Sequence, residues 1–256
     1  MGGGHGRLPW RSWSGDALYW HYDFSGISHS STLAYHDTTY ISSVENLSNN
    51  TTGTTGNFQD GAGGGATSTS PNKTTGNIKA GWSEADFIGD ENHLDISDAN
   101  GIDMNNFTMY LVMRVANEDA NVVNICTGNA SLEDYVYYNA SVNKFTYKVN
   151  NGTQVIQASA NTIADNNNYI LAITFKKDNS MSTTAARETL GVGTTVTSSD
   201  HVGGAFNMKS LGSILGSNSY AIDWYVGEVL IFNGAQGPER LKSVIKELKQ
   251  RWDMQY

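Results

Sequence analysis

Apolar residues at alternate positions mark several short runs of the chain, and this alternation limits the fold more than any other feature. The runs "FTMYLVMRV" (107–115), "KFTYKV" (144–149) and "YILAITF" (169–175) each place apolar side chains on one face. Successive side chains of a β-strand point to opposite sides, so a period of two predicts strands that bury one face. Asn151 and Gly152 then supply the positive-φ pair of a tight hairpin turn.

The end of the chain combines a strand with the one clear helix signal. The run "AIDWYVGEVLIF" (221–232) is apolar on both faces, which predicts a strand that is covered on both sides. A helix is predicted over 238–252, with Pro238 at its first position after Gly237. Its apolar face consists of Leu241, Val244, Ile245, Leu248 and Trp252. We expect this face to cover part of a sheet.

Strands joined by polar turns, with almost no helix before the end, predict two packed antiparallel sheets. The composition agrees, since hydrophobic residues make up 39%, charged residues only 16%, and there are 27 glycines. The predicted fold class is therefore an all-β antiparallel sandwich with a C-terminal amphipathic helix. We divide the chain into an N-terminal arm (1–16) and the sandwich (17–256), which includes a low-complexity surface loop (48–76).

Charge and cysteine content exclude several classes of partner and site. The net charge is −9, and no Lys or Arg occurs between Arg11 and Lys73, so neither nucleic acid nor an anionic membrane is an expected partner. The chain has no apolar run long enough to span a bilayer, and its start lacks the apolar core of a secretory signal, so synthesis in the cytoplasm is expected. Cys126 is the single cysteine and is predicted to be a buried thiol.

Several segments together resemble the concanavalin A-like, or laminin-G-like, jelly-roll domains found in virion structural proteins of tailed bacteriophages. The likeness begins near Leu18. It is carried by "LYWHYDFSG", "ADFIGDENHLDIS" (85–97), "NNFTMYLVMRV" (105–115), "NNYILAITF" (167–175) and "GEVLIFNGAQGPERLKSVIKELKQRW" (227–252). In that family the last strand is followed by a turn and a helix that ends in Trp, which matches Trp252 here. These are packing motifs, so the resemblance implies a fold more than an activity.

Catalysis is not expected from the sequence. Glycosidases of this fold carry alternating carboxylates on one strand, and Glu84 and Asp86 share a strand face, but Ile88 occupies the third place of that pattern. Hydrolysis of glycosides by Glu84 and Asp86 therefore ranks third among the functions that the sequence allows. Asp223 and Glu228 are expected to pair structurally, although the segment Asp223-Trp224-Tyr225 could also border a sugar site.

No bound metal or other cofactor is predicted. The six histidines are scattered, with no spacing typical of a zinc site. Asp90, Asp95 and Asp98 lie in an acidic segment that does not match a calcium-binding loop, and they remain the candidates if Ca²⁺ is bound.

The leading expectation, drawn from the resemblance, is a non-enzymatic virion component, either a capsid decoration or a tail-associated subunit. Its partners would be other virion proteins and further copies of this chain. Arg7, Trp10, Arg11 and Trp13 would anchor the arm on such a partner, because buried Trp and Arg are common interface anchors.

The alternative is a module that binds host surface glycans, with polysaccharide as its partner. Sugar rings stack on exposed aromatic side chains, and the chain has 6 Trp and 13 Tyr. The candidate contacts are Tyr135, Tyr137, Tyr138 and Trp224. Packing within a hairpin is the competing explanation for the tyrosines.

Overall fold

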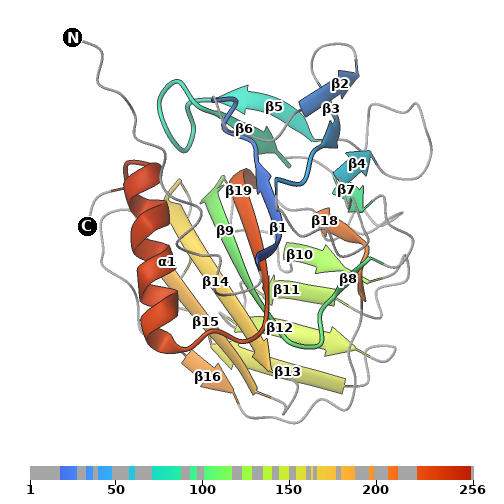
Figure 1. Ribbon diagram of the computed structural model, residues 1–256, viewed down its shortest axis with the longest axis vertical. Helices are drawn as coiled ribbons and strands as arrows, with labels where there is room; N and C mark the ends of the chain where they lie inside the picture. The colour runs from blue at the N-terminus through green and yellow to red at the C-terminus, as the bar shows by residue number, and fades with distance from the viewer. Residues whose placement is uncertain are drawn as a thin grey trace.

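The computed structural model (Figure 1) is an antiparallel β-sandwich with one helix at the C-terminal end, which confirms the predicted fold class. It describes residues 18–27, 33–36, 40–47, 58–60, 71–87, 93–96, 101–116, 123–128, 135–139, 144–149, 154–159, 163, 166–176, 180–187, 196–198, 207–212 and 224–254. Within these ranges, no helix has both the length and the apolar content that crossing a bilayer would need.

The first sheet is built around the last strand, β19, which pairs with β9 along one side and with β1 and β6 along the other. Along one side of β19 (Trp224–Asn233) lie β1 (Leu18–Asp23) and β6 (Ser83–Asp86), each paired with a different part of it, and β5 (Asn72–Thr75) pairs with β6. On the other side the order is β9 (Phe107–Val115), β14 (Asn168–Lys176), β15 (Ser180–Arg187) and β16 (Val196–Ser198).

The second sheet lies opposite the first. Its strands, in order, are β2 (Leu33–His36), β3 (Tyr40–Val44), β4 (Phe58–Asp60), β7 (His93–Ile96), β18 (Ser210–Gly212), β10 (Val123–Thr127), β11 (Tyr135–Asn139), β12 (Lys144–Val149) and β13 (Gln154–Ser159). The described pairing Tyr40–Asn72 joins β3 to β5 and so links the two sheets. A separate short pair is formed by β8 (Ile102–Asp103) and β17 (Asn207–Met208).

The main core fills the space between the sheets. Alternate residues of β9 and β14, such as Leu111 and Leu171, face it, and aromatic rings from both sheets meet within it. Tyr147 of β12, for example, stacks on Phe175 of β14 with ring centroids 4.1 Å apart. Burial of this apolar surface is the main force that holds the sheets together.

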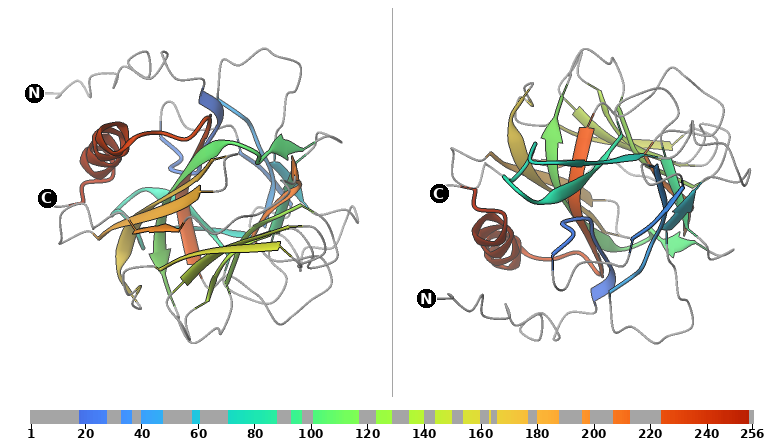
Figure 2. Two further views of the ribbon diagram at one scale, coloured as in Figure 1. Left: turned by 90° about the horizontal axis from the view of Figure 1, so that it is seen from below. Right: turned by 90° about the horizontal axis from the view of Figure 1, so that it is seen from above.

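A second apolar layer lies on the outside of the first sheet, beneath helix α1 (Pro238–Arg251) (Figures 1 and 2). The helix begins after Gly237, with Glu239 in its first turn and Lys249 and Arg251 in its last, as its dipole favours. Its face covers apolar residues of β9, β14 and β19: Tyr110, Val112, Ile170, Ala172, Leu230 and Phe232. Strand β19 is therefore covered on both sides, as the sequence predicts.

Gly227 makes this double burial possible through a β-bulge. The register of β19 against β9 shifts between Val226 and Glu228, so Gly227 is an extra residue on β19. Val226 faces the main core, and Val229 faces it again, whereas Glu228 points to the helix side. The ring of Trp252 packs directly over Gly227, where an added Cβ would lie 2.4 Å from the indole.

Range 48–76, predicted as a surface loop, contributes two short strands to the described structure. Strand β4 pairs with β3 and β7, and β5 pairs with β6. Main-chain hydrogen bonds hold such strands without requiring apolar side chains, so the polar composition of this range gives no periodic signal.

Candidate functional site

One polar row crosses the outer face of the first sheet, beyond the end of helix α1. We call it the ledge, and its residues come one each from neighbouring strands: Asn72, Asp86, Tyr225, Arg114 and Asn168. Each is directly opposite the next, and directly opposed residues of antiparallel strands share a face.

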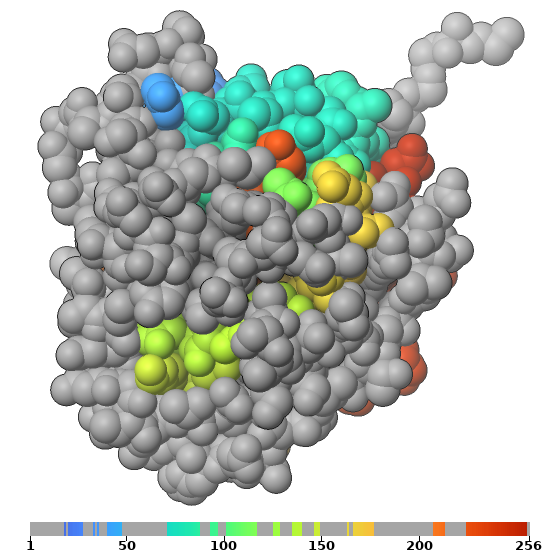
Figure 3. All heavy atoms as spheres, turned by 180° about the vertical axis from the view of Figure 1, so that it is seen from behind, coloured from blue at the N-terminus to red at the C-terminus, as the bar shows by residue number. Residues whose placement is uncertain are grey.

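The ledge lies at the protein surface rather than in the core. Asn72, Asp86, Tyr225 and Arg114 are half-buried, and only Asn168 is buried. Figure 3 shows β5 and β6 (cyan), β19 (orange-red), β9 (green) and β14 (gold) reaching the surface side by side. The row is thus accessible at the part of the outer face that the helix leaves uncovered.

Hydrogen bonds fix one end of the ledge. Arg114 Nη1 donates to Asn168 Oδ1 at 3.1 Å, and Asn168 Nδ2 donates to the carbonyl oxygen of Ile78 at 3.1 Å. Burial raises the pKa of Tyr225, and the nearby Asp86 and Glu84 raise it further, against the opposing effect of Arg114. The Tyr225 hydroxyl therefore keeps its proton and can donate or accept a hydrogen bond.

The turn between β5 and β6 borders the ledge and is held by Glu84. Glu84 Oε1 accepts hydrogen bonds from the backbone N–H and the side-chain Nδ2 of Asn77, both at 2.8 Å, and from Thr74 Oγ1 at 3.3 Å. Glu84 is fully buried. Glu84 and Asp86 do share a strand face, as the sequence predicts, but this arrangement gives Glu84 the role of fixing the turn.

A buried group of charges ties the end of the helix to β1 and β19. His21 Nε2 and Glu228 Oε1 are 2.8 Å apart, and Trp252 Nε1 donates to Glu228 Oε2 at 2.8 Å. Arg251 contacts Asp23, and its Nε lies 3.0 Å from Glu228 Oε2. The expected structural pairing of Glu228 is found here, while Asp223 lies outside the described residues.

The electrostatics of this group give it a structural role. Burial alone would raise the pKa of Glu228, but Arg251, His21 and the Trp252 hydrogen bond together hold that pKa below its ordinary value. Burial raises the pKa of Asp23, and the charge of Glu228 raises it further, against the effect of Arg251. His21, Asp23 and Glu228 bring potential metal-ligand atoms within 4.8 Å of one another. The guanidinium of Arg251 already supplies the positive charge that a metal ion would bring there.

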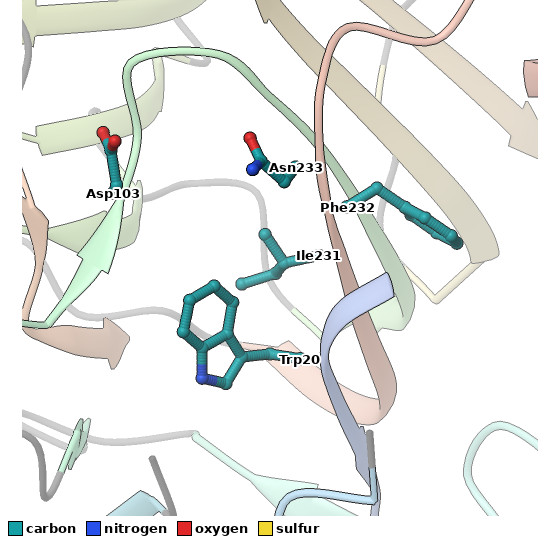
Figure 4. A pocket seen from close by; sticks show the side chains of 5 residues that line it. All are labelled: Trp20, Asp103, Ile231, Phe232 and Asn233. Carbon is teal, nitrogen blue, oxygen red and sulfur yellow. The ribbon is translucent and has the colours of Figure 1, made fainter. Parts of the chain in front are cut away.

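A small hollow near one end of the sandwich is lined by Trp20, Asp103, Ile231, Phe232 and Asn233. These residues belong to β1, β8 and β19, and Figure 4 shows the ring of Phe232 pointing away from the other side chains. Its volume is about 30 Å³, which is enough for about one water molecule. The hollow is therefore too small for a sugar ring.

The predicted glycan-contact residues divide between a surface and the core. Tyr135 and Tyr137 point to the outer face of the second sheet, where their ring centroids are 5.0 Å apart, and Tyr135 is buried while Tyr137 is half-buried. Lys148 Nζ donates to Tyr135 Oη at 3.0 Å. Tyr138 and Trp224 instead lie in the main core, 2% and 1% exposed. The prediction that these two rings contact a glycan needs correction, because alternation turns both toward the opposite sheet.

The remaining predicted residues are mostly beyond what the structure describes. Asp95 lies on β7, with Oδ1 3.8 Å from Nε2 of His93. The other calcium candidates, Asp90 and Asp98, lie outside the described residues. So do the docking residues of the N-terminal arm, Arg7, Trp10, Arg11 and Trp13.

The sequence alone identifies one part of the ledge and misses the rest. It points to Asp86 as a carboxylate of interest and to Tyr225 as a neighbour of Trp224. It gives no indication of Asn72, Arg114 and Asn168, because only strand register brings them into line with Tyr225. The one local signal is that Arg114 is the single charged residue in the otherwise apolar and neutral run "FTMYLVMRV".

No family model and no curated protein sequence matches the chain. Solved structures resemble it in fold. One is an arabinofuranosidase complexed with arabinofuranosyl-α-1,2-xylobiose, with a TM-score of 0.63 and 12% sequence identity over 91% of this chain. The match covers 62% of the arabinofuranosidase chain, so our chain spans less than two thirds of that protein.

Two further structures show the same fold with different ligands. The ligand-binding domain of botulinum neurotoxin serotype D, in complex with N-acetylneuraminic acid, gives a TM-score of 0.54 and 9% identity over 91% of this chain and 51% of its own. Domain 4 of AbnA, an extracellular arabinanase from Geobacillus stearothermophilus in complex with arabinotriose, gives 0.50 and 13% over 90% of this chain and 98% of its own. The chain is thus similar in fold to an arabinofuranosidase, to a domain of an arabinanase and to the ligand-binding domain of a neurotoxin.

Proposed function

We propose that this chain is a non-enzymatic glycan-binding β-sandwich and that saccharide binds along the ledge. The observation that carries the proposal is the row itself, in which the half-buried Tyr225 lies between Arg114 and Asp86 on adjacent strands. Sugar recognition combines an aromatic surface with a few polar groups that fix orientation. The ledge offers both, with the Tyr225 ring as the aromatic surface and the half-buried Arg114 and Asp86 as the polar groups on either side.

The fold likeness supports this choice of function. The three similar structures named above are complexes with arabinofuranosyl-xylobiose, arabinotriose and N-acetylneuraminic acid, and all three ligands are saccharides. Sequence identity of 9–13% carries no individual residue from those proteins to this chain. The placement on the ledge therefore rests on the geometry of this chain's own residues.

The test is binding of the purified chain to an array of plant, bacterial and animal oligosaccharides, followed by calorimetry with the best ligand. Tyr225→Ala is expected to weaken binding by at least about tenfold, because truncation removes the ring on which a sugar would stack. Tyr225→Phe keeps the ring and should retain most of the affinity.

Tyr137→Ala is the matched control, since it truncates a half-buried tyrosine on the outer face of the second sheet. It should leave the affinity unchanged. Loss of binding in Tyr137→Ala with full binding in Tyr225→Ala would move the site to Tyr135 and Tyr137. Absence of saccharide binding across the array would refute the proposed function.

The proposal leaves open the expectation of a virion subunit, because a virion protein can also bind sugar. No described residue bears on that expectation. Deleting residues 1–15 should leave a folded domain that no longer joins its assembly if the arm docks as predicted.

Glycoside hydrolysis would instead be detected as released reducing ends that Glu84→Gln or Asp86→Asn abolishes.

A further inference from the structure

In the part of the chain that the structure describes, Arg114 on β9 lacks the kind of acidic partner that Arg251 has at the end of helix α1. Among the described residues, no carboxylate oxygen lies within ion-pair distance of its guanidinium, whereas Arg251 contacts both Asp23 and Glu228. Asp86 belongs to the same row, but β19 lies between β6 and β9. Two strand spacings separate these residues, which is roughly 10 Å.

The guanidinium is nevertheless held in place. Asn168 accepts from Nη1, and Asn168 is itself buried and anchored to the Ile78 carbonyl of the β5–β6 turn. An arginine has five N–H donors in a planar fork, and this hydrogen bond uses one of them. Restricting the side chain beforehand reduces the entropy lost when the remaining donors bind a ligand.

We infer that the ledge selects saccharides that carry a carboxylate, and that Arg114 binds the carboxylate through paired N–H···O bonds. The inference rests on the proposed glycan-binding function and names the chemical class of the ligand. A planar guanidinium matches a carboxylate in geometry, and hydrogen bonds between these charged groups are about twice as strong as neutral ones.

Because the chain has a negative net charge, binding of an acidic saccharide requires a specific contact with a positively charged side chain. At −9, the protein as a whole repels an anionic ligand at long range. Non-specific attraction therefore cannot account for retention of an acidic saccharide, and a local cation on the ledge must supply it. Uronic and sialic acids both carry the required carboxylate, so the experiment includes one of each.

The experiment measures affinities for two matched pairs of ligands by calorimetry on the intact chain. The first pair is trigalacturonic acid and its methyl ester, and the second is 3′-sialyllactose and lactose. In at least one pair, the free acid should bind on the order of tenfold to a hundredfold more tightly than its neutral partner. Arg114→Gln should remove this preference, because only the free acid makes the charged contact that the substitution takes away.

Lys242→Gln is the charge-matched control. It removes one positive charge from the exposed face of helix α1, where Lys242 pairs with Glu239 at 3.0 Å. The preference for the acid should survive this substitution, and thermal unfolding of each variant checks that it is folded. Arg114→Lys retains the charge without the fork and should recover only part of the preference.

The possible results separate this inference from the function on which it rests. Binding that depends on Tyr225 but is equal for acid and neutral partners, or tighter for the neutral ones, would overturn the carboxylate preference and leave the glycan-binding function intact. A preference for the acid that persists in Arg114→Gln would likewise overturn the role of Arg114. If neither these ligands nor any saccharide of the array binds, both proposals fail together.

Discussion

Gly227 shows how one residue connects the two buried faces of β19. As the extra residue of a bulge, it turns Glu228 toward the helix while Val226 and Val229 both face the main core. Its missing side chain also gives room to the ring of Trp252. The position of Glu228 in the buried charge group and the packing of Trp252 at the end of the helix therefore both depend on this glycine.

Gly227→Ala should destabilise the protein by about 1–3 kcal/mol, because the new methyl group would meet the indole of Trp252. Chemical denaturation measures the change. Gly237→Ala is the control for a methyl group that meets nothing, since no atom lies within 4 Å of the position that its Cβ would take, and at this helix N-cap it should cost no more than about 1 kcal/mol. In the background of Trp252→Ala the effect of Gly227→Ala should shrink; an undiminished effect would contradict the clash.

Glu228 gives a prediction about pH. Its pKa in the fold lies below the ordinary 4.5, so its stabilising contribution is complete above pH 4.5 and is lost as the pH falls through the folded pKa. Glu228→Gln should cost about 3 kcal/mol at pH 7, because Arg251 loses a buried partner. The difference in unfolding free energy between the native protein and Glu228→Gln should become smaller as the pH falls below 4.5. Denaturation curves from pH 7 to pH 3 test this, and a gap independent of pH would exclude the charge as its cause.

At the scale of elements, helix α1 is an essential cover for the first sheet. Ile245 is fully buried against the outer apolar layer, whereas Lys242 on the same helix is exposed. Ile245→Ala should lower the free energy of unfolding by about 2–5 kcal/mol through lost burial and the cavity left behind. Lys242→Ala should change it by less than about 0.5 kcal/mol. Equal effects would mean that the helix does not pack as described.

Some elements can be predicted from the sequence and others cannot, because some depend on local periodicity and others on pairing with distant parts of the chain. Helix α1 and strands β9, β12 and β14 follow from periods of 3.6 and 2, which are local properties. Strand β5 has no apolar pattern and depends on its pairing with β6. The ledge is harder still, because no local pattern states which residues of β9 and β19 are opposite. The bulge at Gly227 also shifts by one residue which side chains of β19 face the core. Strict alternation counted back from Val229 would therefore place Trp224 on the outer face, whereas the structure places Tyr225 there.

At the scale of the whole molecule, the two sheets enclose one main core that contains the single cysteine. Cys126 is fully buried, and burial raises the pKa of its thiol to about 12. The thiolate is the reactive form, so the native protein should react with a disulfide reagent only through opening of the sandwich. Reaction should accelerate across the denaturation transition. Labelling of the native protein at the rate of free cysteine would show that the sheets do not close over β10.

Glycan binding along the ledge is tested most directly by locating bound saccharide on the molecule. Amide and side-chain NMR signals of the isotopically labelled chain can be followed as the best array ligand is added. We predict the largest shifts at Asp86, Arg114, Asn168 and Tyr225. Shifts confined to Tyr135, Tyr137 and Lys148 on the second sheet would contradict binding at the ledge.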